Sequence, residues 1–160
     1  MSRYLSLGFF LLAVVAASAI GGSFATGAWY QEIAKPSWTP PDWVFGPAWG
    51  LIYVCMAVAA WQVWLSRHSL RFGALTWWFL VLLLNVSWSW LMFGLHRPGW
   101  AFMVCALILV FAVMTCRVFF LVSSRPGLLL LPLVLWTSFA CVLNYAVWSL
   151  NGGGIGQMFG

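Results

Sequence analysis

The sequence predicts an all-α membrane protein, a bundle of five transmembrane helices that forms a single domain over residues 1–160. Hydrophobic residues make up 64% of the chain, charged residues make up only 6%, and the mean hydropathy is +1.00. A soluble domain carries about 25% charged residues, because water must wet its surface. So few charges suit a lipid environment instead, and the chain has five apolar stretches of the length that a bilayer requires.

Short segments containing Gly, Pro, Ser, Arg or His separate these five stretches. A bilayer core about 30 Å thick is crossed by about 20 residues of helix. Each stretch must be helical, because five strands of this length could not close a barrel without exposing backbone groups to lipid. The predicted helices cover residues 4–27, 44–65, 72–94, 99–122 and 126–149, and a loop covers residues 28–43.

The first stretch shares some features with a secretory signal peptide. Arg3 precedes an apolar run that contains Ala17-Ser18-Ala19, a pattern of small residues typical of a cleavage site. The apolar run continues to Ala28, however, which is longer than the core of a signal peptide. We therefore expect this stretch to be retained as the first helix.

The loop between the first two helices is rich in proline. Pro36, Pro40 and Pro41 fix their own φ angles and bias the preceding residues toward extended geometry. The loop is therefore expected to be stiff and to hold Trp38 in place as a cap over a cavity. The alternative is a loop that its tryptophans anchor to the lipid headgroups.

The second, third and fifth helices each present a face that combines an aromatic residue with small or polar residues. Residues three or four positions apart share one face of a helix. Asn85 and Asn144 are expected to point inward, because an asparagine in hydrocarbon must find hydrogen-bond partners. The faces either line a cavity with flat aromatic walls or hold the helices together. They consist of Trp49, Tyr53 and Ala57, of Asn85, Trp88 and Ser89, and of Trp136, Ala140 and Asn144.

The fourth and fifth helices each contain one unusual residue. Arg117 is the one charge well inside a predicted helix. Its stem can carry the charge to the nearer interface, or its guanidinium can pair with a ligand carboxylate. Pro132 is expected to bend or unwind the fifth helix.

The four cysteines lie in apolar runs without a CxxC pair, which favours a role as small fillers between helices. They are Cys55, Cys105, Cys116 and Cys141.

The distribution of charge predicts the orientation in the membrane. An odd number of helices puts the two termini on opposite sides, and the side rich in Lys and Arg is cytoplasmic. We therefore expect a cytoplasmic N-terminus, with the 28–43 loop and the C-terminus outside. The basic side carries Arg3, Arg67, Arg71 and Arg125, with Arg117 in reach, and the other side carries Lys35 and Arg97 together with Glu32 and Asp42.

The sequence lacks the residues that several classes of chemistry require. His68 and His96 both fall in predicted loops, so no histidine is placed to ligate a haem iron or another metal within the bundle. Glu32 and Asp42 are the only carboxylates, which leaves no tuned acid–base pair. The basic residues are scattered singly, which argues against binding of nucleic acid.

These motifs resemble the TspO/MBR family, which comprises the tryptophan-rich sensory proteins of bacteria and the mitochondrial translocator protein. The resemblance covers roughly residues 20–151. It departs from the family at Leu133, where an aromatic residue is common, and after Tyr145, where no basic residue completes a sterol-recognition pattern. The matching residues are Trp29-Tyr30, Lys35-Pro36-Ser37-Trp38-Thr39-Pro40-Pro41, Val44-Phe45, Trp49, Tyr53, Leu84-Asn85-Val86-Ser87-Trp88-Ser89, Pro132, Trp136, Ala140 and Val142-Leu143-Asn144-Tyr145.

The resemblance implies a five-helix bundle, often dimeric, with a pocket beneath the first loop. Members of the family bind porphyrins such as protoporphyrin IX, some bind sterols, and light-dependent porphyrin breakdown has been attributed to bacterial members. The ligand-binding residues that the motifs imply are Trp29, Tyr30, Trp38, Trp49, Asn85, Trp88, Trp136, Ala140 and Asn144, and helical spacing adds Tyr53.

The leading hypothesis is a membrane-embedded protein that binds a metal-free porphyrin by stacking it on indoles, with the ligand carboxylates toward the first loop, near Lys35 or the interface. No cofactor is required, and the expected partners are the porphyrin, membrane lipid and a second copy of the chain. Photo-oxidation of bound porphyrin, with Trp49 and Trp136 as candidate redox residues, is one extension, and a regulatory or sensory role is another. The alternatives are transport of porphyrin, sterol or other small apolar ligands across the membrane, and a helper subunit that acts through a partner protein.

Overall fold

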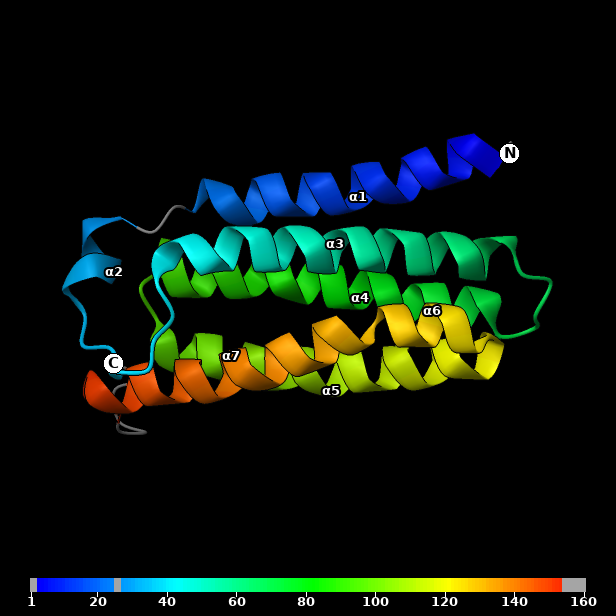
Figure 1. Cartoon of the computed structure of the whole chain (residues 1–160). Helices are drawn as coiled ribbons and strands as arrows, with labels where there is room; N and C mark the ends of the chain where they lie inside the picture. Colours follow the sequence, from blue (N-terminus) through cyan, green and yellow to red (C-terminus); the bar gives the residue numbers. More distant parts are fainter. Residues whose placement is uncertain (1–2, 25–26, 154–160) are drawn as a thin grey trace.

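The computed structural model describes residues 3–24 and 27–153, and the regular structure in this part of the chain is helical. Five segments within these residues are long and apolar enough to cross a membrane, which confirms the predicted fold class (Figure 1). The elements are α1 (Arg3–Ser23), α2 (Ala28–Glu32), α3 (Asp42–Leu65), α4 (Arg71–Ser89) with a π-helical turn (Trp90–Gly94), α5 (Pro98–Val122), α6 (Ser124–Leu129) and α7 (Leu131–Leu150).

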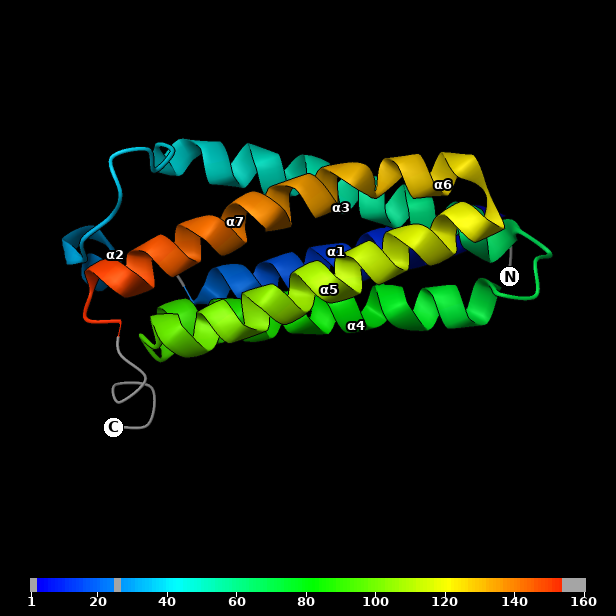
Figure 2. The ribbon, with the colours of Figure 1, turned by 90° about the horizontal axis from the view of Figure 1, so that it is seen from below.

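The helices form a bundle in which neighbours in space are not always neighbours in sequence. Helix α1 packs against α3 and α4, α5 packs against α4 and α7, and α6 packs against α3 and α5. Helices α3 and α7 lie close together near α6 and diverge toward α2 (Figures 1 and 2). The bundle is therefore closed at the α6 end and more open at the α2 end.

Two boundaries differ from the sequence-based expectation. Helix α1 ends at Ser23 rather than at residue 27, directly after Gly21 and Gly22, which are poor helix formers. Residues 25 and 26 lie outside the described part of the chain. The proline-rich loop is not extended throughout, because it begins with the short helix α2.

The predicted interruption of the fifth helix is confirmed at Leu130, between α6 and α7. Pro132 stands at the start of α7 and has no backbone N–H to donate to the preceding turn. Gly127 lets α6 approach α5 closely, since a Cβ at this position would lie 2.4 Å from the Phe120 ring. The break and this contact direct α6 toward α3 and α5 and leave α7 free to diverge from α3.

The half of the bundle near α6 has a solid core. Trp78 is fully buried at its centre, and its indole N–H donates to the carbonyl of Met56 at 3.0 Å. Its ring meets the edge of Phe10 with the centroids 5.5 Å apart. Ala60 and Phe119 are also fully buried in this cluster. The same helices continue into the open half, so the packing near α6 fixes their positions there as well.

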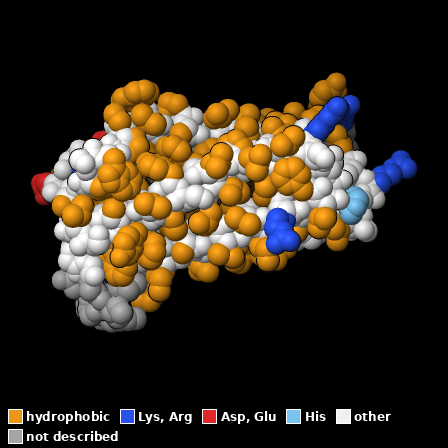
Figure 3. Space-filling view, turned by 60° about the horizontal axis from the view of Figure 1, so that its bottom comes forward, with side chains coloured by type: hydrophobic (Ala, Val, Ile, Leu, Met, Phe, Trp, Pro, Cys, Tyr) orange, Lys and Arg blue, Asp and Glu red, His pale blue; other side chains and the backbone are white. Residues whose placement is uncertain are grey.

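Charge and apolar surface are arranged as a membrane protein requires. Basic side chains gather toward the α6 end, acidic side chains lie at the α2 end, and apolar side chains cover the flank between them (Figure 3). Arg117 is exposed on α5 and does not face the interior. The positive-inside rule relates this charge asymmetry to orientation, and the cytoplasmic N-terminus stays a prediction.

Candidate functional site

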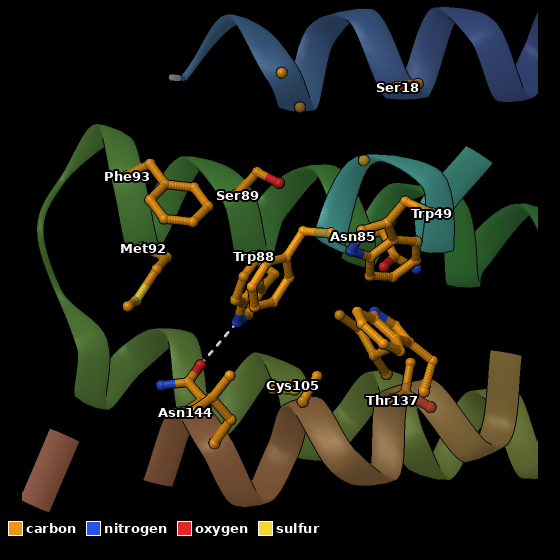
Figure 4. A pocket seen from close by; sticks show the side chains of 18 of the residues that line it. Ser18, Trp49, Asn85, Trp88, Ser89, Met92, Phe93, Cys105, Thr137 and Asn144 are labelled. Carbon is orange, nitrogen blue, oxygen red and sulfur yellow. Dashed lines mark hydrogen bonds between the residues drawn. The ribbon is translucent and has the colours of Figure 1, made fainter. Parts of the chain in front are cut away.

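A cavity of about 410 Å³, here called the central cavity, lies in the open half of the bundle between the middle of the helices and α2. Side chains from α1, α2, α3, α4, the π-helical turn, α5 and α7 line it (Figure 4). Eight of the ten predicted ligand-binding residues meet there: Tyr30, Trp49, Tyr53, Asn85, Trp88, Trp136, Ala140 and Asn144.

Aromatic side chains from two helices form much of the wall. On α3, Trp49 and Tyr53 are one turn apart, and their rings lie 5.4 Å apart with 33° between their planes. On α7, Trp136 meets the edge of Phe45 with the centroids 5.8 Å apart. Among the described residues, the indole N–H groups of Trp49 and Trp136 have no hydrogen-bond partner. The wall therefore combines flat apolar faces with two donors that a ligand can use.

Asn144 connects three helices beside the cavity. Its side-chain oxygen accepts a hydrogen bond of 2.8 Å from the Trp88 indole of α4, shown as the dashed line in Figure 4. Its amide nitrogen donates to the carbonyl of Pro98, the first residue of α5, at 3.0 Å. Asn144 thus lines the cavity and also holds α4, α5 and α7 together, so the two interpretations of its sequence position both apply.

Asn85 makes a more local contact. Its amide nitrogen donates to the carbonyl of Val81 in the same helix at 2.9 Å. Its side-chain oxygen accepts no hydrogen bond within the described residues. Asn85 therefore contributes an acceptor to the central cavity without joining helices.

Replacing Asn144 with leucine is expected to lower the free energy of unfolding by about 1–2 kcal/mol, because two interhelical hydrogen bonds are lost together. Asn85→Leu is the matched control, since it removes an amide of the same size that bonds only within its own helix. Thermal unfolding of both variants in detergent measures the difference. Equal loss in the two variants would contradict a connecting role for Asn144.

Polar groups from the first loop meet at the outer end of the cavity. The side-chain nitrogen of Gln31 donates to a carboxylate oxygen of Asp42 at 3.0 Å. Tyr30 lies beside them, and burial raises the pKa of its phenol, with a further increase from the negative charge of Asp42. The Lys35 ammonium lies 4.6 Å from the centre of the Tyr30 ring. Of these groups, Tyr30 and Asp42 line the cavity, so a neutral phenol and a carboxylate face a ligand at this end.

The two remaining predicted residues lie outside the cavity wall. Trp38 is 47% exposed and rests against α7, where its ring centroid lies 6.0 Å from that of Phe139 in an edge-on contact; it is not a lining residue of the cavity. Trp29 stacks on His96, with the ring centroids 4.4 Å apart. The loop is held at another point, where the side-chain amide of Asn151 forms two hydrogen bonds with the backbone of Ala34, at 2.8 and 3.0 Å.

Sequence reasoning missed part of the lining. Met92 and Phe93 of the π-helical turn also line the cavity. They lie three and four residues after Ser89, so helical spacing could have added them to the predicted face of this helix. Gly46 and Gly50 of α3 line the cavity as well. Over the described residues, no group of three His, Cys, Asp or Glu side chains is arranged to hold a metal ion.

Comparisons with known proteins agree with the motifs. The family model described as the TspO/MBR family matches residues 9–149. Protein CrtK of Rhodobacter capsulatus is 36% identical over 146 residues, which cover 90% of this chain and 91% of that protein. The human translocator protein is 35% identical over 140 residues, covering 84% and 83% of the two chains. The tryptophan-rich sensory protein of Cereibacter sphaeroides is 32% identical over 142 residues, covering 89% of each.

Proposed function

The chain belongs to the TspO/MBR family of membrane proteins, and we propose that its central cavity binds a flat, largely apolar tetrapyrrole of the protoporphyrin IX type. The observation that carries this proposal is the aromatic wall of the cavity. The indoles of Trp49, Trp88 and Trp136 come from three different helices and surround one space within the bundle. Flat apolar ligands bind in cavities of this kind, with a few polar groups that set their orientation.

The polar groups of the cavity suit the metal-free ring. The indole donors of Trp49 and Trp136 and the acceptor of Asn85 can pair with polar atoms of a ligand. No histidine is among the described lining residues, so the site offers no imidazole to an iron at the centre of the ring. We therefore propose binding of the porphyrin through stacking and hydrogen bonds.

Saturable quenching of tryptophan fluorescence by protoporphyrin IX, measured in detergent and in the dark, tests the proposal. A cavity with three tryptophans is expected to give a binding curve that saturates at micromolar ligand. Quenching that rises linearly without saturation would indicate partition of the porphyrin into detergent and would contradict the proposal.

The charge of Asp42 provides a more specific prediction. Protoporphyrin IX carries two carboxylates, and Asp42 adds a negative charge to the outer end of the cavity. Asp42→Asn is therefore expected to tighten binding about two- to fivefold, which corresponds to about 0.5–1 kcal/mol for a partly solvated charge pair. Titration of the dimethyl ester of the same porphyrin is the control, because this ligand is uncharged and its affinity should not change. If Asp42→Asn bound both ligands as tightly as the parent does, the carboxylates of the porphyrin would not lie near Asp42.

Light-dependent oxidation of the bound porphyrin is a second candidate function. Trp49 and Tyr53, two oxidisable side chains, lie together in the cavity wall. In the first step, the light-excited porphyrin would accept one electron from an indole, and dioxygen would serve as the oxidant for later opening of the ring. Illumination of the titrated sample is then expected to convert the porphyrin to a new absorbing product. Equal rates of loss in the parent and in a Trp49→Phe, Trp136→Phe variant would contradict a redox role for these tryptophans.

A further inference from the structure

A second cavity of about 310 Å³, here called the interfacial pocket, lies at the α2 end of the protein. Trp29 of α2, the turn at His96 and Arg97, and Trp148 near the end of α7 form its walls. It shares no lining residue with the central cavity. The proposed function therefore does not account for it.

The charge around the interfacial pocket favours an anion. Arg97 lines it and brings a positively charged guanidinium. No Asp or Glu is among the described residues that line it. The first turn of α5, which begins at Pro98 and is 25 residues long, forms another part of the wall. The N-terminus of a helix carries a partial positive charge and directs backbone N–H groups at a ligand.

The position of the pocket identifies the source of the anion. Three tryptophans, Trp29, Trp100 and Trp148, surround it at one end of the transmembrane segments. Tryptophans are enriched at the level of the lipid headgroups. The anionic group present at this level of a membrane is the phosphate of a phospholipid. We propose that the interfacial pocket binds the phosphate group of a membrane phospholipid.

A bound phosphate would hold the first loop against the bundle. The pocket lies between α2, the start of α5 and the end of α7, which come from three distant parts of the chain. Two existing contacts already join these parts: the stack of Trp29 on His96 and the hydrogen bonds of Asn151 to Ala34. Occupancy of the pocket adds a third contact and stabilises the folded protein by mass action.

The test uses the purified full-length chain after removal of lipid, with native mass spectrometry to count adducts and thermal unfolding to measure stability. The probes are a short-chain phosphatidylglycerol, a diacylglycerol with the same acyl chains but no phosphate, and inorganic phosphate. The phosphatidylglycerol is expected to bind and to raise the unfolding temperature, whereas the diacylglycerol has neither effect. Arg97→Gln is expected to weaken phosphatidylglycerol binding about tenfold. Arg117→Gln, which removes an exposed charge near the other end of α5, is the matched control and should bind like the parent.

The test contains no porphyrin, so its outcome does not depend on the function proposed for the central cavity. Equal binding of the diacylglycerol and the phosphatidylglycerol by the parent protein would overturn it, and this comparison does not depend on a variant that folds. Unchanged binding by Arg97→Gln would overturn the assignment to this pocket. Inorganic phosphate that stabilises the parent as strongly as the lipid does would overturn the lipid as the source of the phosphate.

Discussion

Replacing Gly50 with leucine is expected to reduce protoporphyrin IX binding by at least about tenfold while the protein remains folded. Gly50 lines the central cavity, and no atom lies within 4 Å of a Cβ built at this position. An added side chain therefore starts in open space beside the cavity, where the leucine is expected to take up room that the ligand needs. The substitution also removes a poor helix former from the interior of α3, which is worth up to about 1 kcal/mol. A tenfold loss corresponds to about 1.4 kcal/mol of binding free energy.

Gly8→Leu is the matched control for this prediction. Gly8 lies in α1, has no atom within 4 Å of an added Cβ, and is not a lining residue of the central cavity. Both variants replace a glycine with leucine, and only the one at Gly50 does so in the cavity wall. Quenching titrations should show weakened binding for Gly50→Leu and parental binding for Gly8→Leu. Parental affinity in Gly50→Leu, with an unfolding temperature no lower than that of the parent, would mean that the porphyrin binds elsewhere.

The residues of the central cavity show why regular helical spacing predicted most of the site. Trp49 and Tyr53 share a face because they are four residues apart in a helix without interruption at that point. The same holds for Trp136, Ala140 and Asn144 in α7. A polar amide within an apolar stretch has few stable places other than the interior. Period and polarity together were therefore sufficient for these positions.

Contacts between distant parts of the chain explain the positions that spacing could not predict. Met92 and Phe93 are a different case, because they lie three and four residues after Ser89 and continue the predicted face into the π-helical turn. The path of the first loop depends on contacts with distant parts of the chain. Asn151 is 117 residues from Ala34, and Phe139 is 101 residues from Trp38, so no local pattern indicates either contact. The positions of Trp29 and Trp38 therefore required the three-dimensional structure.

Replacing Trp78 with alanine is expected to lower the free energy of unfolding by about 3–5 kcal/mol, the range for removal of a buried tryptophan. The side chain is fully buried in the solid half of the bundle, so its loss leaves a void that the surrounding helices cannot fill. The variant also loses the hydrogen bond to the Met56 carbonyl and the edge contact with Phe10. Thermal or denaturant unfolding in detergent, followed by circular dichroism, measures the change.

Trp43→Ala is the control for this substitution, because Trp43 is 75% exposed at the start of α3 and its removal leaves no internal void. A small loss of stability in Trp43→Ala and a large one in Trp78→Ala would assign stability to the half of the bundle near α6. Stability would then be separable from binding, since Gly50→Leu alters only the open half. Equal losses in the two tryptophan variants would instead mean that lipid or detergent fills the space left by Trp78, and that the α6 half does not hold the cavity walls in place.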